Sequence, residues 1–338
     1  MIWQFAHIWN QSLEIGRPER VLVPRTKIWA SELGGSYIDR YLKMKAVPPT
    51  NPPNPRSMRK FEAGNMLEWL VGLVLSRAGI LVGNQQWLQF EYPFLCPVSG
   101  KYDYEAGGKP DFSKALNEVK MLGLPEFFGR ATENIIKHFI EKYPNGLERI
   151  ILEIKSCSNF MMERYERTGK PDIKHSLQSF HYLKAKNMPE AHVVYICKDD
   201  LRMAEFEIVH PNPVLEKLYR DDVEKITKYL KEGIEPPKEK EIYFDYDVLK
   251  FSDNWKVAYS NYLTMLYGYQ NQKEYDDKYK PIASRFNRVL KRVVAGAKIT
   301  KKNEDIIAEI KTFFPEYEDI VEKARQVPID SGELEDEE

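Results

Sequence analysis

The stretch RIILEIKSCSN, residues 149–159, combines the apolar pattern of a buried strand with two opposite charges. Glu153 and Lys155 interrupt a run of isoleucine and leucine. Because side chains alternate between the two faces of a strand, Glu153 and Lys155 are expected on the same face. A charge in a low-dielectric interior needs a partner, so a salt bridge between the two is the simplest interpretation. Other acids gathered beside them would instead indicate a functional site.

The composition is that of a globular protein. The chain has 338 residues, 43% hydrophobic and 30% charged, with a formal net charge of −1. A nucleic-acid partner is therefore not indicated by overall charge, and any basic surface must be local. No apolar run reaches the roughly 18 residues of a membrane span, and the N-terminus does not read as a secretory signal. We expect no membrane association and a cytoplasmic protein, in the host cytoplasm if the gene is phage-borne.

The cysteines indicate a reducing compartment. Cys96, Cys157 and Cys197 are far apart, odd in number and form no CxxC pair, which predicts reduced thiols. Cys157 falls on the Glu153 face of the predicted strand. A buried, inert thiol is the simpler interpretation of that position.

The order of predicted elements indicates a mixed α/β core over residues 58–210. The expected elements are a helix at 58–79, strands at 87–95 and 100–106, a helix at 112–142, a strand at 150–156, a helix at 173–187, and strands at 191–198 and 204–210. The core is expected to contain an insertion at 112–147. It is flanked by a helical lead-in with a proline-rich connector (1–57), a helical extension (211–326) and an acidic, disordered tail (327–338). Ser31 can cap a helix in the lead-in.

Two further carboxylates could join Glu153 and Lys155 in a metal site. Mg²⁺ takes oxygen ligands and usually combines one or two carboxylates with waters and phosphate oxygens. Asp103 lies in a strand-like segment, and Glu68 lies in the helix GNMLEWL. Beside a metal, the Lys155 ammonium can orient the attacking water and offset phosphate charge. Metal-assisted hydrolysis of a phosphodiester needs this set of groups.

Five motifs in order resemble the PD-(D/E)XK nuclease superfamily, and within it the RecB-like group that includes CRISPR-associated exonucleases. They are GNMLE (64–68), GKYD (100–103), ILEIK (151–155), QSFHY (178–182) and VVYICKDD (193–200). The resemblance implies a restriction-endonuclease-like core, a mixed central sheet flanked by helices, with helical N- and C-terminal extensions. It also implies a Mg²⁺-dependent DNA nuclease, an exonuclease of recombination, repair or phage metabolism, in which Mn²⁺ can substitute.

The resemblance implies a role for each matched residue. Asp103, Glu153 and Glu68 would hold the metal together with the backbone carbonyl of Ile154. Lys155 would be the catalytic lysine. The Fe–S members of the group need four cysteine ligands, so three scattered cysteines predict no cluster.

Other residues are candidates for nucleic-acid contact. Gln178 and Tyr182, at i and i+4 on one helical face, would border the site or contact the DNA backbone. A second, basic helical face would contact phosphate beside a nuclease core, although such faces are usually only solvated. Its residues are Arg285, Arg288, Lys291 and Arg292.

Several alternatives stay open at this point. GKPD makes Asp111 a rival of Asp103, although Pro110 disfavours a central strand there. Glu118 and Lys120 form a second E-x-K, but on a helix they would not share a face. The same site would also suit a structure-specific endonuclease, an RNase or a non-catalytic nucleic-acid-binding subunit. The sequence does not give the oligomeric state.

Overall fold

The computed structural model describes residues 5–15, 21–111, 113, 117 and 126–326. The chain divides into two compact units. Unit 1 comprises Met1–Pro48 and Pro53–Pro236, and unit 2 comprises Pro49–Pro52 and Pro237–Glu338. Among the described helices, none is long and apolar enough to cross a lipid bilayer.

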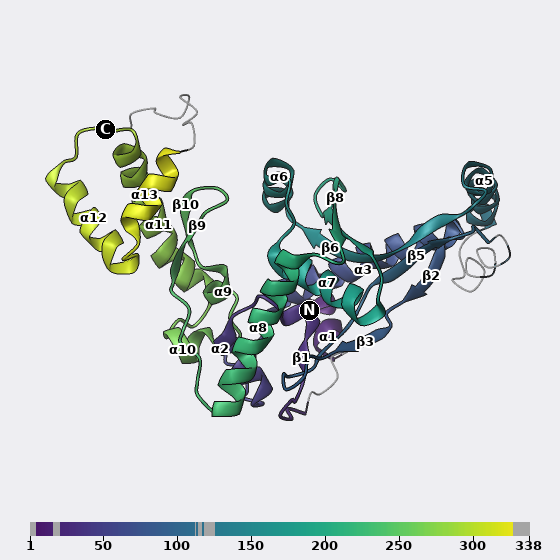
Figure 1. Cartoon of the computed structure of the whole chain (residues 1–338), viewed down its shortest axis with the longest axis horizontal. Coiled ribbons are helices and arrows are strands. Elements are labelled where there is room, and N and C mark those ends of the chain that lie inside the picture. Colours follow the sequence, from purple (N-terminus) through teal and green to yellow (C-terminus); the bar gives the residue numbers. More distant parts are fainter. Residues whose placement is uncertain (1–4, 16–20, 112, 114–116, 118–125, 327–338) are drawn as a thin grey trace. The chain divides into compact units, whose positions relative to one another are not determined.

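The core of unit 1 is a five-stranded mixed sheet with strand order β2-β5-β6-β7-β8 (Figure 1). Its strands are β2 (Leu81–Asn84), β5 (Tyr104–Gly108), β6 (Leu147–Cys157), β7 (Glu190–Cys197) and β8 (Met203–Val209). Strands β6 and β7 run parallel, and the other neighbouring pairs are antiparallel. The unit is thus the mixed α/β structure expected from the sequence, a central sheet flanked by helices, consistent with a restriction-endonuclease-like fold.

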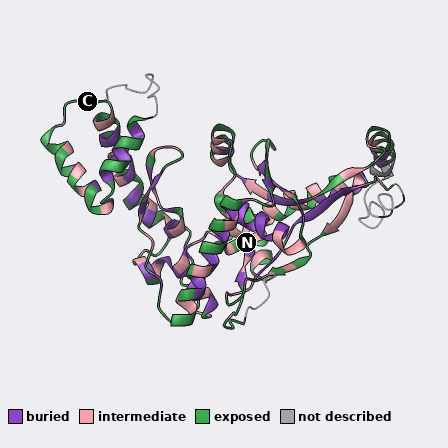
Figure 2. Cartoon of the chain, in the orientation of Figure 1, coloured by how far each residue is buried: buried purple, intermediate pink, exposed green. Residues whose placement is uncertain are grey.

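The two faces of β6 have different roles, as the alternation of its side chains predicts. Leu152 and Ile154 belong to an apolar cluster with residues of β5 and β7, and α3 (Pro55–Arg77) packs against this cluster through Leu67 and Val71. Glu153 and Lys155 lie on the opposite face. Figure 2 shows that buried residues follow the central strands of this sheet.

Two helices follow β6 in the chain. They are α6 (Asn159–Thr168) and α7 (Ile173–Lys186). The Asp172 side chain caps α7 by accepting the Lys174 N–H, and Asn187 ends the helix in the left-handed conformation. The α7 bounds agree with the helix predicted at 173–187. This helix packs on the sheet side that carries Glu153 and Lys155, through side chains described below.

The stretch predicted as one strand at 100–106 is split. Strand β4 (Val98–Lys101) pairs with β1 (Ile28–Trp29) and β3 (Trp87–Phe90) in a separate small sheet, whereas β5 belongs to the main sheet. Asp103 lies at the bend between β4 and β5, not inside a strand. The chain bends there because its two halves pair with different strands, which a local pattern does not reveal.

The N-terminal part of unit 1 contains α1 (Phe5–Ile15), a 3-10 turn and α2 (Tyr37–Met44). The prediction that Ser31 caps a helix here is wrong. Ser31 lies in the 3-10 turn, and the Ser36 side chain caps α2 by accepting the Asp39 N–H. The helix therefore begins later in the lead-in than the apolar pattern indicated.

Helix α8 (Pro213–Glu232) belongs to unit 1, so this unit continues past residue 210, where the sequence placed the end of the core. The Arg40 guanidinium of α2 donates two hydrogen bonds to the Asp222 carboxylate of α8, at 2.7 and 2.8 Å. Both side chains are buried. Within the predicted insertion, α5 (Glu126–Lys142) is helical, whereas Glu118 and Lys120 lie outside the described residues.

Unit 2 is helical around a small hairpin that the sequence reading missed. Its elements are β9 (Ile242–Asp245), β10 (Lys250–Asp253), α9 (Trp255–Ala258), α10 (Leu263–Tyr267), α11 (Gln272–Val294), α12 (Lys301–Phe313) and α13 (Tyr317–Arg325). Phe251 of β10, Phe286 of α11 and Phe314 pack in one apolar core. The aromatic residues of this region therefore mostly build a core, as aromatic stripes on helices usually do.

Candidate active site

Strand β6 places Glu153 and Lys155 on one face, and their ion pair forms as the simplest interpretation predicted. The Lys155 Nζ donates to Glu153 Oε1. The Glu153 side chain is 1% exposed, whereas that of Lys155 is 25% exposed. Glu153 is therefore enclosed by protein, while part of the Lys155 side chain stays exposed.

Asp103 joins this pair from the bend just before β5. Tyr104 is in register with Leu152, so extending this antiparallel register by one residue brings Asp103 opposite Glu153. The buried Asp103 carboxylate accepts a hydrogen bond from the Ile154 backbone N–H, at 2.7 Å from N to Oδ2. Asp111, the rival aspartate, is exposed, and its backbone N–H donates to the Gly79 carbonyl. The structure thus brings Asp103, and not Asp111, to the strand of Glu153.

Gln85 connects two acids of the cluster, and the sequence analysis did not identify it. Its side-chain Nε2 donates to Glu68 Oε1 at 2.6 Å and lies 3.5 Å from Asp103 Oδ1. Its backbone N–H also donates to the Asp103 carbonyl, with Gln85 itself at a positive φ of 47°. Glu68 of α3 therefore does approach Asp103, with an amide between the two carboxylates. The polar stretch NQQ (84–86), which includes the end of β2, was the local signal in the sequence.

Burial raises the pKa of all three acids, and charges of neighbouring acids add to the rise at Glu153 and Glu68. Burial raises the pKa of Glu153 to about 8, with the Lys155 ammonium opposing and the Asp103 and Glu68 charges adding to the rise. Burial also raises the pKa of Asp103, against the opposing effect of Lys155. Burial and the Asp103 charge raise the pKa of Glu68. A cluster with this excess of negative charge is best satisfied by a cation.

The Lys155 amine is held in its charged form. Burial lowers its proton affinity, but the charges of Glu153, Asp103 and Glu68 outweigh burial and leave its pKa above the usual value. The side chain therefore offers a permanent positive charge beside Glu153. An ammonium at this place can attract a phosphate oxygen or orient a water molecule.

Glu153 retains one oxygen that the protein does not use. Its Oε2 is buried and has no hydrogen-bond partner among the described residues. Leaving a buried carboxylate oxygen unpaired costs free energy, on the order of 1–3 kcal/mol or more for a charged group. Such an atom fits a site whose remaining ligand is a cation.

The donor atoms suit a hard divalent cation. Glu153 Oε2 and the Asp103 carboxylate are oxygen ligands of the kind that Mg²⁺ takes. In a strand, the N–H and C=O of one residue point toward the same neighbour, so the Ile154 carbonyl is directed to the side on which its N–H meets Asp103. Among the described residues, no group of three or more His, Cys, Asp or Glu side chains is positioned to hold a metal. Glu68 accepts a hydrogen bond from Gln85 and does not form a three-residue metal-binding group with Glu153 and Asp103.

Tyr195 and His175 lie near Lys155, and neither was predicted as a site residue. Tyr195 of β7 is the cross-strand neighbour of Lys155. Its hydroxyl shares a 2.8 Å hydrogen bond with His175 Nδ1 and accepts the Asp172 N–H at 3.0 Å. Burial, together with the charges of Lys155 and Lys174, lowers the pKa of His175 well below its usual value. A neutral imidazole therefore lies close to the lysine.

Gln178 and Tyr182 of α7 border the site from inside the protein. Gln178 Nε2 donates to the Tyr182 hydroxyl at 2.9 Å, and this hydroxyl donates to the Lys101 carbonyl at 2.6 Å. Lys101 ends β4, two residues before Asp103, so the two side chains support the bend that carries the aspartate. Both are buried, and in this structure they have no surface to offer a nucleic acid.

The remaining candidates lie elsewhere. Arg285 is paired with Glu309 of α12, through hydrogen bonds of 2.7 and 2.5 Å. Arg288, Lys291 and Arg292 are exposed on α11 in unit 2. Cys157 is buried beside Cys197, and burial raises the pKa of its thiol to about 11, which fits an inert side chain.

Comparisons with known proteins add little. No protein-family model matches the chain, and no curated protein matches its sequence. Among solved structures, it is similar to the crystal structure of SSO0001, with a TM-score of 0.40 and 14% identity, covering 70% of this chain and 90% of that one. It is also similar to the alkaline exonuclease LHK-Exo from Laribacter hongkongensis, with a TM-score of 0.32 and 12% identity, covering 62% of this chain and 90% of that one. The complex of LHK-Exo with dAMP gives a TM-score of 0.33. These likenesses are low.

Proposed function

We propose that unit 1 is a Mg²⁺-dependent nuclease that hydrolyses phosphodiester bonds in DNA, acting as an exonuclease. The observation that carries the proposal is the buried, unpaired Oε2 of Glu153, which lies in one cluster with Asp103 and the charged Lys155. Buried acids with raised pKa values around a lysine are not explained by a contribution to the stability of the fold alone. They are typical of sites where a cation and a substrate complete the charge balance.

Three residues would form the cation site. Glu153 and Asp103 would hold the cation, with the Ile154 carbonyl as a further ligand. The bound ion would supply the positive charge that makes a water more acidic and a phosphate more electrophilic. The Ile154 N–H holds the Asp103 carboxylate beside the strand that carries Glu153.

Lys155 would act on the water and the phosphate. Its side chain is partly exposed, and its charge is maintained by the acids around it. It can therefore attract the phosphate and orient the attacking water without itself losing a proton. Tyr195, the cross-strand neighbour of the lysine, and the neutral His175 near it are candidate positioning residues.

The test is a cleavage assay of the purified full chain. Linear and circular DNA, single- and double-stranded, and a matched RNA are incubated with Mg²⁺, Mn²⁺ or EDTA. We expect cleavage of linear DNA with either cation, none in EDTA and none of circular DNA. Cutting of circular DNA would indicate an endonuclease, and cutting of RNA alone an RNase. Binding without any cleavage would indicate a non-catalytic subunit and would overturn the proposal.

A further inference from the structure

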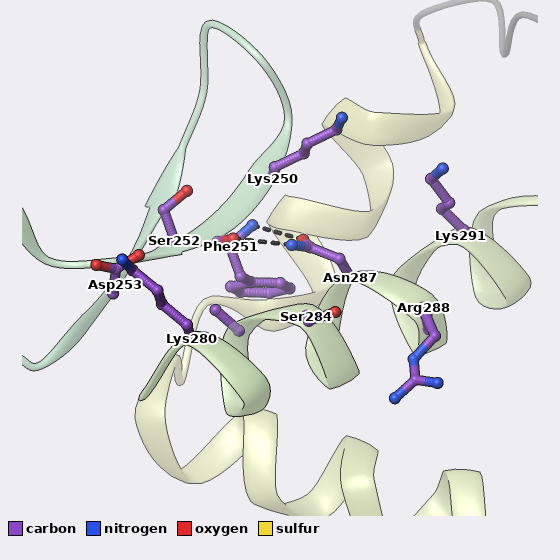
Figure 3. A pocket seen from close by; sticks show the side chains of 10 residues that line it. Lys250, Phe251, Ser252, Asp253, Lys280, Ser284, Asn287, Arg288 and Lys291 are labelled. Atoms are coloured by element: carbon purple, nitrogen blue, oxygen red, sulfur yellow. Dashed lines mark hydrogen bonds between the residues drawn. The ribbon is translucent and has the colours of Figure 1, made fainter. Parts of the chain in front are cut away.

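A basic pocket of about 360 Å³ lies in unit 2, between β10 and α11 (Figure 3). Lys250, Ser252 and Asp253 of β10 form one side. The α11 side is lined by Lys280, Ala283, Ser284, Asn287, Arg288 and Lys291. The pocket therefore gathers four cationic side chains from two elements that are far apart in the sequence, against a single acid.

The walls of the pocket are fixed to each other. The Phe251 backbone N–H donates to the Asn287 side-chain oxygen at 2.7 Å, and Asn287 Nδ2 donates to the Phe251 carbonyl at 2.8 Å. The Asn287 amide thus bonds to β10 as a neighbouring strand would. Phe251 itself is only 2% exposed and belongs to the core of unit 2. The pocket accordingly has a rigid floor but offers no open aromatic face on which a base could stack.

Asp253, the acid among the lining residues, lies at one end of the pocket. Lys280 is paired with Asp276 at 2.9 Å and also lies close enough to Asp253 to lower the pKa of that acid, although burial raises it overall. Figure 3 shows Lys280 beside Asp253, with Lys250, Arg288 and Lys291 toward the other end. Lys250 and Arg288 have no hydrogen-bond or ion-pair partner in the described part of the chain. An anion is therefore favoured at the end away from Asp253.

We infer that this pocket binds the phosphodiester backbone of a nucleic-acid strand. The cations are spread along the pocket and do not converge on one point, which suits consecutive phosphates better than a single small anion (Figure 3). The hydroxyls of Ser252 and Ser284 can donate to phosphate oxygens. With cations and hydroxyls but no open ring, contact is made to the backbone and is independent of sequence. The inference rests on the proposed function in one respect: the bound strand is taken to be the DNA that unit 1 cleaves.

The test measures binding of a labelled DNA single strand to the full chain in EDTA, over a range of salt concentrations. The double variant Lys250→Gln/Arg288→Gln should bind about tenfold more weakly, with a salt dependence smaller by about 1.4 units, because two phosphate contacts are lost, each contributing about 0.7 on a single strand. Ser284→Glu, which removes no cation but adds a negative charge to the pocket, should also weaken binding. Lys273→Gln, an exposed lysine of the same helix outside the pocket, should leave affinity unchanged.

Two results would overturn the inference. One is unchanged affinity and salt dependence in both pocket variants, whose folding is checked by melting curves. The other is competition by dAMP or inorganic phosphate as effective as competition by the strand, which would make the pocket a small-anion site. Cleavage by the wild type is measured separately in Mg²⁺. If the wild type cleaves nothing but the pocket variants bind the strand more weakly, the pocket is supported and the nuclease proposal is rejected. If the wild type cleaves DNA but the pocket variants bind as well as the wild type, the nuclease is supported and the pocket is rejected.

Discussion

The Asp103 carboxylate is held by the backbone N–H of Ile154, the residue between Glu153 and Lys155. This one bond fixes an acid from the bend just before β5 to the strand that carries the other acid and the lysine. Because the bond uses a main-chain donor, a side-chain substitution at Ile154 leaves it in place. The relationship explains how a residue fifty positions away from Glu153 joins the same site.

Asp103→Asn should lower turnover by orders of magnitude in the cleavage assay. The substitution keeps the shape of the side chain but removes one of the few anionic ligands, so the cation binds more weakly and its water is less acidic. Asp111→Asn is the matched control, since Asp111 is exposed beyond β5, and it should retain activity. The reverse ranking, with melting curves unchanged, would show that the wrong aspartate has been assigned.

Glu68→Gln should reduce cleavage less than Asp103→Asn. Glu68 is half-buried, hydrogen-bonded to Gln85 and outside any three-residue metal group in the described chain, so its effect on the cation is through charge and not through direct ligation. Raising the Mg²⁺ concentration should restore much of the lost rate. If Glu68→Gln is as inactive as Asp103→Asn at every Mg²⁺ concentration, Glu68 is a direct ligand.

Glu153→Gln should raise the melting temperature in EDTA and remove the stabilisation by Mg²⁺. The substitution eliminates a buried carboxylate that shares its surroundings with two other acids. The wild type should gain about 2.7 kcal/mol of unfolding free energy at a Mg²⁺ concentration about one hundred times the dissociation constant. Thermal scans with and without Mg²⁺ measure both effects. A variant that Mg²⁺ still stabilises as much as it does the wild type would place the cation elsewhere.

His181 should make the fold sensitive to acid. Burial lowers the pKa of His181 to about 4, with a backbone hydrogen bond to Leu88 opposing, and the ring stacks on Tyr219. The unfolded chain takes up a proton near pH 6.5 and the folded one does not, so stability is lost as the pH falls from about 6.5 toward 4. The full loss is about 3 kcal/mol.

Denaturant titrations between pH 4 and 7 measure this dependence. His181→Phe keeps the ring but does not titrate, so its unfolding free energy should fall less steeply with acid than that of the wild type. At neutral pH the variant should lose about 1 kcal/mol, because the hydrogen bond to the Tyr219 hydroxyl is removed. Parallel curves for the two proteins over this range would contradict the assignment.

The sequence predicted the parts of the site that lie in regular elements. The apolar pattern around Glu153 and Lys155 located β6, and the helical spacing of Gln178 and Tyr182 located α7. Local pattern was sufficient because each of these elements buries a continuous face. The burial of Gln178 and Tyr182 did not follow from spacing, since it depends on where the bend after β4 packs.

The parts that sequence did not predict depend on contacts between distant segments. Gln85 and Tyr195 matter because of what lies opposite them, which no pattern in their own strands or turns reveals. The hairpin of β9 and β10 was missed because each strand has four residues, too few for an alternating pattern to stand out. Its pairing is stabilised by the core of unit 2 and by Asn287, thirty-six positions away from Phe251.

The most direct test compares cleavage of linear DNA by the wild type, Lys155→Ala and a control, Lys217→Ala, an exposed lysine of α8. Rates are measured in Mg²⁺, and strand binding is measured in EDTA. The account predicts cleavage by the wild type and the control, none by Lys155→Ala, and strand binding by all three. Cleavage by Lys155→Ala at the wild-type rate, or no Mg²⁺-dependent cleavage by the wild type, would contradict it.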